Sequence, residues 1–392
     1  MRIAIAFEFA SLNGGEQSML AVVDSLRGTG AAAWEFVGLA PPEGPLADAL
    51  RKRGIRLVPL VLQDKAGRRF PPDVSAGLLR EAAVEAAADV LHANSLSLAR
   101  LTGRLAARQA AAGALSAGQA LPVCTGHLRD MLRLSGAAMR DLAGNHCLVA
   151  VSGATAGYHI ARGLPADKVR ILHNGVDLNR FRPRPDAGEL RRQLRADLGI
   201  SETAAIALTV GQIGLRKGLD VLASAAALLA EAVPQLHFVI VGQRFSAKEE
   251  TRQWEQSVRA TFETGGLAGR THWPGWRDDL PELMNGADLL VHPALQEPLG
   301  RVLLEAAACG LPIVATRVGG TAEILRDGNS ALLVPPGDRE QLTGAIRDLV
   351  AEPELRKQFA LNGRRRIEAD FSVGLAAGRL GAFWREMYGA CR

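Results

Sequence analysis

Residues 291–323 have the sequence VHPALQEPLGRVLLEAAACGLPIVATRVGGTAE. The pattern predicts a strand, a loop, a helix, a second strand and a glycine loop that leads into another helix. Pro298 favours a helix start, because its fixed φ and missing N–H cost little there. Leu299, Gly300 and Arg301 would then present free backbone N–H groups, which with the helix dipole make an anion site. Gly300 lacks a Cβ and lets a ligand approach the backbone closely.

Two glutamates, Glu297 and Glu305, lie eight residues apart around this expected helix start. From Gly300 to Glu305 the helix would rise ~7.5 Å at 1.5 Å per residue. That spacing leaves room for a diphosphate between the groups that the two carboxylates contact. The alternative is an ordinary β-α-β unit in which the two glutamates are a coincidence, and the pair alone does not exclude it.

The whole stretch closely resembles the retaining glycosyltransferases of family 4, which carry Glu-x7-Glu, then Gly-x-Pro and a Gly-Gly loop. These motifs correspond here to Glu297 and Glu305, to 310–312 and to 319–320. The resemblance is strong over most of the C-terminal half and looser over the N-terminal half. It implies an α/β protein of GT-B architecture, with two Rossmann-like, doubly wound parallel-sheet domains facing a deep interdomain cleft. It also implies that Glu297 contacts the donor sugar and Glu305 the ribose.

Length and composition agree with a two-domain globular protein. The chain has 392 residues, of which 48% are hydrophobic and 22% charged, and this length exceeds one typical domain. We expect an acceptor-binding domain at 1–183, a donor-binding domain at 184–372, and a last helix at 373–392 that packs back on the first domain. The four cysteines are scattered, and nothing near the N-terminus resembles a signal peptide, so we expect a cytoplasmic protein without disulfides or structural zinc.

Charge is shared unevenly between the two halves. Residues 1–185 carry 22 Lys and Arg against 15 Asp and Glu, a net +7, and the remainder carries 24 against 26, a net −2. A basic first half favours an anionic partner, such as an acidic glycan, a polyprenyl phosphate or the inner face of a membrane contacted peripherally. A solvated arginine-rich surface is the alternative. We expect no nucleic-acid partner.

The N-terminal half alternates short apolar strands with helices, which predicts a parallel sheet covered on both faces. Gly14 and Gly15 follow the first strand, at the sheet edge where open α/β sheets bind ligands. His127 follows a later strand at the same edge, where a packed or surface histidine is the alternative. The family resemblance implies that the glycine loop lines the cleft and that a histidine here binds the donor sugar. His127 is the better match and His92 the second choice.

The second half contains a further glycine loop, GQIGLRKGLD at 211–220, that leads into a helix. Lys217 has the compact charge that suits a nucleotide phosphate, and a solvated lysine at a helix start is the alternative. The family usually carries an Arg directly after the first Gly of this loop and a Lys five residues later, both on the diphosphate. Lys217 matches, but Gln212 replaces the Arg, so the diphosphate would depend more on Lys217, Arg216 or helix N–H groups.

Two further loops contain the sequences GQR, at 242–244, and GWRDD, at 275–279. The resemblance places the nucleotide base near them, which makes Arg244 and Arg277 candidate neighbours of the base. Asp278 and Asp279 have the position of helix-capping residues. No convincing Asp-x-Asp motif is present, so we expect no metal and no cofactor besides the nucleotide-sugar co-substrate.

These features predict a retaining glycosyltransferase that moves a sugar from a UDP- or GDP-sugar to a hydroxyl of a glycan, lipid-linked or small-molecule acceptor. His127, Glu297 and Lys217 would be its catalytic residues. A nucleotide-sugar epimerase of the same fold would need paired acid and base groups, which we do not find. A pyridoxal-dependent phosphorylase would need a lysine that binds the cofactor, and we identify no such site in this sequence. A silent sugar-nucleotide-binding module is favoured only by Gln212.

Overall fold

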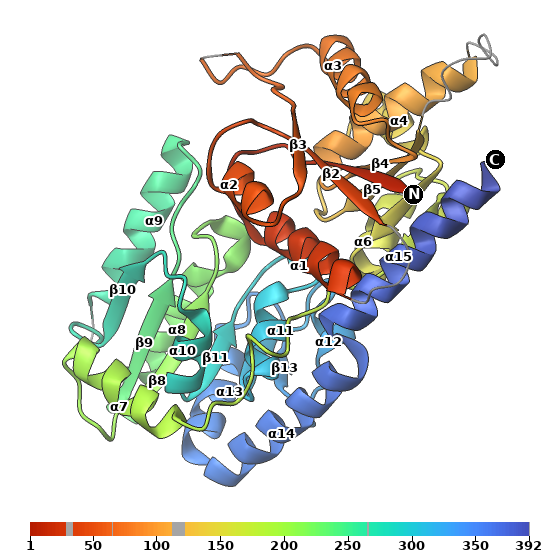
Figure 1. Ribbon diagram of the computed structural model, residues 1–392. Coiled ribbons are helices and arrows are strands. Elements are labelled where there is room, and N and C mark those ends of the chain that lie inside the picture. The colour runs from red at the N-terminus through yellow and green to blue at the C-terminus, as the bar shows by residue number, and fades with distance from the viewer. Residues whose placement is uncertain (29–33, 65, 112–121, 265, 392) are drawn as a thin grey trace. The chain divides into compact units, whose positions relative to one another are not determined.

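The computed structural model describes residues 1–28, 34–64, 66–111, 122–264 and 266–391. These residues form two compact units (Figure 1). Unit 1 comprises Met1–Gly175 with Val373–Arg392, and unit 2 comprises Val176–Ser372. The chain therefore passes from one unit to the other at 175/176 and again at 372/373.

Unit 1 contains a seven-stranded parallel sheet with the order β3-β2-β1-β4-β5-β6-β7. Its central strands are short and almost wholly apolar, as expected of strands that are covered on both faces. The first strand, RIAIA, buries every residue after Arg2. The strands are β1 Arg2–Ala6, β2 Glu35–Ala40, β3 Arg56–Pro59, β4 Val90–Ala93, β5 Val123–Leu128, β6 Cys147–Ala150 and β7 Val169–Ile171.

The helices of unit 1 come from two distant parts of the sequence. They are α1 Gly14–Gly28, α2 Pro45–Lys52, α3 Pro72–Glu85, α4 Leu96–Ala111, α5 Gly136–Ala143, α6 Gly153–Ile160 and the C-terminal α15 Val373–Ala390. Ser152 caps α6, because its hydroxyl accepts a hydrogen bond from Thr155 N at 2.9 Å. Helix α15 packs beside α1 (Figure 1), and its Trp384 is fully buried in the core on that side of the sheet.

Unit 2 contains a six-stranded parallel sheet with the order β10-β9-β8-β11-β12-β13. This is the Rossmann order, in which the strand sequence reverses once, between β8 and β11. The strands are β8 Ala205–Val210, β9 Leu236–Val241, β10 Thr271–Gly275, β11 Leu289–His292, β12 Ile313–Thr316 and β13 Leu332–Val334.

Helices pack on this sheet through an apolar core that includes Leu222, Phe238 and Phe262. The helices of unit 2 are α7 Ala187–Leu198, α8 Leu219–Ala232, α9 Glu249–Phe262, α10 Leu280–Gly286, α11 Arg301–Ala308, α12 Thr321–Ile324, α13 Arg339–Ala351 and α14 Pro353–Asp370. Two doubly wound parallel sheets are the fold class that the sequence predicts.

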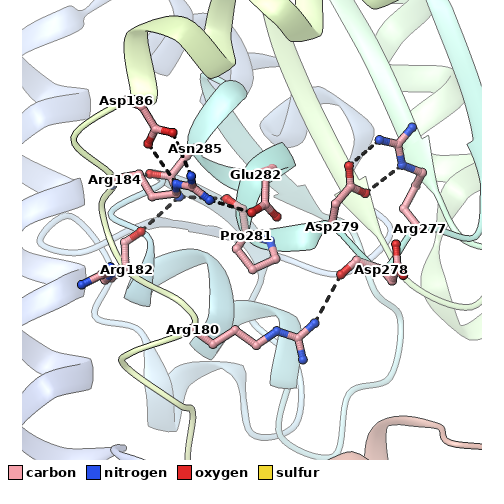
Figure 2. Close-up of polar contacts among 10 residues, drawn as sticks. All are labelled: Arg180, Arg182, Arg184, Asp186, Arg277, Asp278, Asp279, Pro281, Glu282 and Asn285. Carbon is pink, nitrogen blue, oxygen red and sulfur yellow. Dashed lines mark hydrogen bonds and ion pairs between the residues drawn. The ribbon is translucent and has the colours of Figure 1, made fainter.

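The proline-rich segment Arg182-Pro183-Arg184-Pro185 is held against α10 (Figure 2). Asn285 of α10 donates to the Arg182 carbonyl at 3.1 Å and accepts from Arg184 N at 2.9 Å. The Arg184 guanidinium contacts Glu282 at 2.6 Å and Asp186 at 2.8 Å. This segment is therefore an integral part of unit 2.

Candidate active site

The strand order of unit 2 places a candidate site at the carboxyl ends of β8 and β11. Open α/β sheets bind ligands where the strand order reverses, because the flanking loops leave on opposite faces and open a crevice. A small pocket lies at this position, between the loop after β8, the end of β9 and the end of β11. Gly211, Gln212 and Lys217 line it from the first loop, and His292 lines it from β11.

Beside this pocket, one carboxylate oxygen contacts two nitrogen-bearing side chains. Lys217 Nζ lies 2.6 Å from Glu297 Oε2, and His292 Nε2 lies 2.9 Å from the same oxygen. The side chains of Glu297 and His292 are almost fully buried, and that of Lys217 is 15% exposed. The structure thus brings together two of the catalytic residues expected from the sequence and adds a histidine.

The protonation states of these groups follow from their surroundings. Burial opposes the charge on Glu297, but the Lys217 ammonium and the hydrogen bonds from His292 and Lys217 outweigh it and hold the Glu297 pKa well below its usual range. Burial, reinforced by the nearby Lys217 charge, lowers the pKa of His292 despite its bond to Glu297. His292 is therefore neutral and donates its Nε2–H to an ionised Glu297.

Backbone contacts join the two loops that carry Lys217 and Glu297. The Arg216 carbonyl accepts hydrogen bonds from Leu295 N at 2.9 Å and from Gln296 N at 3.3 Å. A Cβ on Gly218, which has φ +63°, would lie 2.0 Å from the Pro293 carbonyl oxygen. Only glycine permits this conformation and this approach together.

The loop of Glu297 is fixed from its other side by the Gly-Gly turn. Gly320 N donates to the Glu297 carbonyl at 3.0 Å. A Cβ on Gly319, which has φ +54°, would lie 1.8 Å from that same carbonyl oxygen. The Gly-Gly motif therefore lets the backbone at 319–320 pack directly against the backbone carbonyl of Glu297.

Helix α11 begins three residues later than the position of Pro298 predicts. Gly300 precedes it with φ +104°, which is a conformation outside the helix, and Arg301 is the first helical residue. The helix end is therefore at Arg301, whereas Leu299 belongs to the preceding loop and its side chain is buried. The expected helix start at Pro298 is wrong because the Gly300 backbone does not continue the helix.

Glu305 is buried one turn into α11 and pairs with a residue of its own helix. Arg301 Nε lies 2.9 Å from Glu305 Oε1. Burial raises the pKa of Glu305, and the charges of Arg301 and Arg180 act against this rise. The Arg301 guanidinium thus lies beside the Glu305 carboxylate, one turn further along the helix.

The other donor-site candidates of unit 2 have local partners or lie on the surface. Arg244 Nε bonds Glu255 at 2.9 Å, and Arg277 Nε bonds Asp279 at 2.8 Å (Figure 2). The capping role expected of Asp279 is wrong, because its side chain pairs with Arg277 and caps no N–H of α10. The side chains of Gln212 and Arg216 are exposed.

In unit 1 the two histidine candidates contact each other. His92 of β4 has its Nε2 2.6 Å from Nδ1 of His127 of β5, and both side chains are buried. Gly14 and Gly15 begin α1, and a Cβ on Gly15 would contact the Arg129 side chain at 3.4 Å. Arg129 in turn bonds Asn94 and Asn174, so its guanidinium is held by side chains of unit 1.

Two residues of these clusters escape sequence reasoning. His292 ends a buried strand five residues before Glu297, and this strand-end position is its only local signal. Trp384 lies in α15, and its indole contacts His92 across 292 residues of sequence. No local sequence pattern predicts that contact. Within the described ranges, no cluster of three or more His, Cys, Asp or Glu side chains is arranged to hold a metal.

Two family models match the chain, one over each half. The model of the glycosyl transferases group 1 matches residues 191–366, and the model of Glycosyltransferase Family 4 matches residues 12–180. The chain belongs to this glycosyltransferase family. Together the two matches include Gly14, His127, Lys217 and Glu297.

Individual relatives of this family match over about half of the chain. The D-inositol 3-phosphate glycosyltransferase of Segniliparus rotundus is 33% identical over 200 residues, which are 50% of this chain and 42% of the relative. The lipopolysaccharide glucosyltransferase WaaG of Escherichia coli is 36% identical over 202 residues, which are 50% of this chain and 51% of WaaG. The chain thus spans only about half the length of these curated relatives.

A solved structure matches along nearly the whole chain. Anabaena HepE, in its crystal structure with UDP-glucose, superposes with a TM-score of 0.81 at 21% identity, covering 98% of this chain and 100% of HepE. This likeness confirms the GT-B fold class. None of the helices in the described part of the chain is long and apolar enough to cross a membrane.

Proposed function

We propose that this family 4 glycosyltransferase moves a sugar from a nucleoside diphosphate sugar, a UDP- or GDP-sugar, to an acceptor hydroxyl, with retention of configuration and without a metal. One observation carries the proposal. The Lys217–Glu297–His292 cluster lies beside a pocket at the point where the strand order of the second sheet reverses.

Lys217 suits the stabilisation of a departing diphosphate. Its ammonium has three donors, of which one binds Glu297; no other acceptor is found for it among the described residues, so two donors can bind phosphate oxygens. The start of α11 at Arg301 adds the positive end of a helix dipole. Preorganised donors aimed at developing charge are usually the largest single contribution to catalysis.

Glu297 suits recognition of the donor sugar. Lys217 and His292 both bind its Oε2, and among the described residues no partner is found for its Oε1. The carboxylate is ionised, so Oε1 can accept a hydrogen bond from a sugar hydroxyl. His292 fixes the orientation of the carboxylate, which keeps Oε1 directed at one position.

Glu305 would bind the ribose hydroxyls, with Arg301 holding the carboxylate in place at 2.9 Å. Unit 2 would then be the donor-binding domain and unit 1 the acceptor-binding domain, in which His127 contacts the donor sugar. In the reaction the bond between the anomeric carbon and the phosphate oxygen breaks. A bond to the acceptor oxygen forms on the same face, and the acceptor proton passes to the leaving diphosphate.

The test is a panel of UDP-, GDP- and ADP-sugars with EDTA present, measured by thermal stabilisation and by slow donor hydrolysis. We expect one donor to raise the Tm of the wild type and to be hydrolysed. Glu305→Ala should abolish the Tm shift, and Glu297→Gln should abolish hydrolysis with a smaller loss of binding. Glu354→Ala is the matched control, since that glutamate is exposed and pairs with the exposed Lys357.

Three results would separate the alternatives. Binding of a donor without turnover, with or without candidate acceptors, would indicate a silent binding module, which the exposed Gln212 in the place of an arginine favours. Inversion at carbon 2 of the donor sugar would indicate an epimerase. If no nucleotide sugar shifts the Tm, or if Glu305→Ala behaves like Glu354→Ala, the proposed donor site is wrong.

A further inference from the structure

A buried chain of hydrogen bonds in unit 1 leads from the C-terminal helix to His127. Trp384 Nε1 lies 3.1 Å from His92 Nδ1, and His92 Nε2 lies 2.6 Å from His127 Nδ1. The Trp384 and His92 side chains are fully buried, and His127 is 4% exposed. Thr125 Oγ1 also contacts His92 Nδ1, at 2.8 Å.

The register of the sheet explains why these side chains meet. His92 of β4 is paired directly with Thr125 of β5. His127 lies two residues beyond Thr125, so its side chain stands on the same face of the sheet. That face is covered by α15, which brings the Trp384 ring to 5.2 Å from the His92 ring in an edge-on arrangement.

The direction of each hydrogen bond follows from the chemistry of the indole. An indole N–H can only donate, so His92 Nδ1 must be an acceptor, and the Thr125 hydroxyl must donate to it as well. Burial, with a further contribution from Arg129, lowers the pKa of His92 to about 3, so this ring is neutral. A neutral ring that accepts at Nδ1 carries its proton on Nε2 and therefore donates to His127.

The same reasoning applies to the ring of His127. His127 Nδ1 accepts from His92, and burial lowers the pKa of His127 well below its usual range, assisted by Arg129 and His92. Its proton is then on Nε2. Among the residues that the structure describes, no group accepts a hydrogen bond from His127 Nε2. This atom is also not among the fully buried polar atoms that lack a partner, so it is accessible from outside. The N–H is available to a ligand oxygen.

We propose that Trp384, His92 and Thr125 are positioning residues that lock His127 as its Nε2–H tautomer, so that it offers a ligand a hydrogen-bond donor and never an acceptor. The ligand group is an uncharged or anionic oxygen, such as a sugar hydroxyl. That last assignment rests on the proposed transferase function, whereas the tautomer lock does not. The C-terminal helix thereby acts on a side chain of β5, which is far from it in the sequence.

The lock is tested first by NMR of the full chain with ¹⁵N-labelled histidine, which needs no substrate. Long-range ¹H–¹⁵N couplings distinguish the two tautomers, and the His92 and His127 signals are identified from their loss in His92→Gln and His127→Gln. We expect both wild-type rings to be protonated at Nε2. Trp384→Phe combined with Thr125→Val removes both donors to His92, and both rings should then become tautomer mixtures. A wild-type His127 protonated at Nδ1 would overturn the proposal.

Trp34→Phe is the matched control. Trp34 packs edge-on against Trp384 with ring centroids 6.2 Å apart, but its own Nε1 has no hydrogen-bond partner among the described residues. The control therefore removes a neighbouring indole N–H without touching the chain of hydrogen bonds. It should leave both tautomers unchanged. A tautomer change in this control equal to that in Trp384→Phe with Thr125→Val would mean that packing alone is responsible.

Kinetics then connect the lock to ligand binding. In the wild-type background, Trp384→Phe with Thr125→Val should lower kcat/KM by roughly 5- to 10-fold, the effect of one lost hydrogen bond. In the His127→Gln background the same pair should have no effect, because a Gln amide donates N–H without any tautomer. An equal loss in both backgrounds would show a purely structural role. A correct tautomer in a chain that turns over no donor would refute the transferase and leave the lock standing.

Discussion

Lys217 Nζ lies 2.6 Å from Glu297 Oε2, which joins the loop after β8 to the loop after β11 across 80 residues of sequence. Neither residue is exposed enough for water to replace its partner fully, since the two side chains are 15% and 8% exposed. The pair therefore supports the fold of the site as well as its charge balance. Removing one partner leaves the other as a poorly solvated charge.

Lys217→Met should destabilise unit 2 by roughly 2–4 kcal/mol, somewhat less than for a fully buried pair. Adding Glu297→Gln should restore part of that loss, because the uncompensated carboxylate is removed. A double-mutant cycle in urea measures both effects. The control Lys357→Met breaks an exposed pair with Glu354 and should cost less than ~1 kcal/mol. If the double variant is as unstable as the two single losses added together, the pair does not couple.

Gly319→Ala should cost far more than a left-handed backbone alone explains. The new Cβ would lie 1.8 Å from the Glu297 carbonyl oxygen, so the loop of Glu297 must move. Gly328→Ala is the matched control, because Gly328 has φ +65° and open space around it, and should cost ~1–2 kcal/mol from conformation alone. Denaturant unfolding and donor binding measure both variants. Equal costs would show that the close approach to Glu297 is unimportant.

The sequence predicts those parts of the site that local patterns specify. Alternating apolar strands and helices predict both sheets, and the loop positions of Lys217 and Glu297 place them at one sheet edge. The start of α11 is missed because the pattern does not show that Gly300 takes φ +104°. A proline at a plausible helix start is compatible with either boundary.

The remaining parts depend on contacts between distant segments. His292 appears in the sequence as one more buried strand residue, and only the approach of the next loop gives it Glu297 as a partner. The link from Trp384 to His92 spans 292 residues, and it depends on where α15 packs. The engagement of Arg244 by Glu255 likewise follows from the orientation of α9 and not from the GQR motif.

Stability should fall as the pH is lowered below ~6.5, in part because of His92. The unfolded chain protonates this histidine near its usual pKa of 6.5, whereas burial lowers the pKa in the folded protein to about 3. Between these values only the unfolded state binds the proton, so the folded state loses on the order of 1.4 kcal/mol per pH unit from this group. His92→Gln should reduce the slope of unfolding free energy against pH between 5 and 6.5. Parallel slopes for variant and wild type would contradict the neutral, buried His92.

Asn285 should be the most sensitive point of the segment that leads into α7 (Figure 2). Its side chain donates to Pro281 O at 2.8 Å and to Arg182 O at 3.1 Å, and it accepts from Arg184 N at 2.9 Å. Pro183 and Pro185 have no N–H, so the segment has few other ways to attach itself to α10.

Asn285→Ala leaves the Arg184 N–H and the Arg182 carbonyl without this partner and should cost ~2–3 kcal/mol. Asn285→Asp keeps the acceptor but loses both donors, and a carboxylate beside two carbonyl oxygens should be at least as destabilising. Asn362→Ala is the control, because Asn362 makes one exposed bond to Asn329 O and should change stability by less than ~0.5 kcal/mol. Thermal and urea unfolding measure the free energy of unfolding of each variant. If Asn285→Asp is tolerated while Asn285→Ala is not, the acceptor alone holds the segment and the two donated bonds contribute nothing.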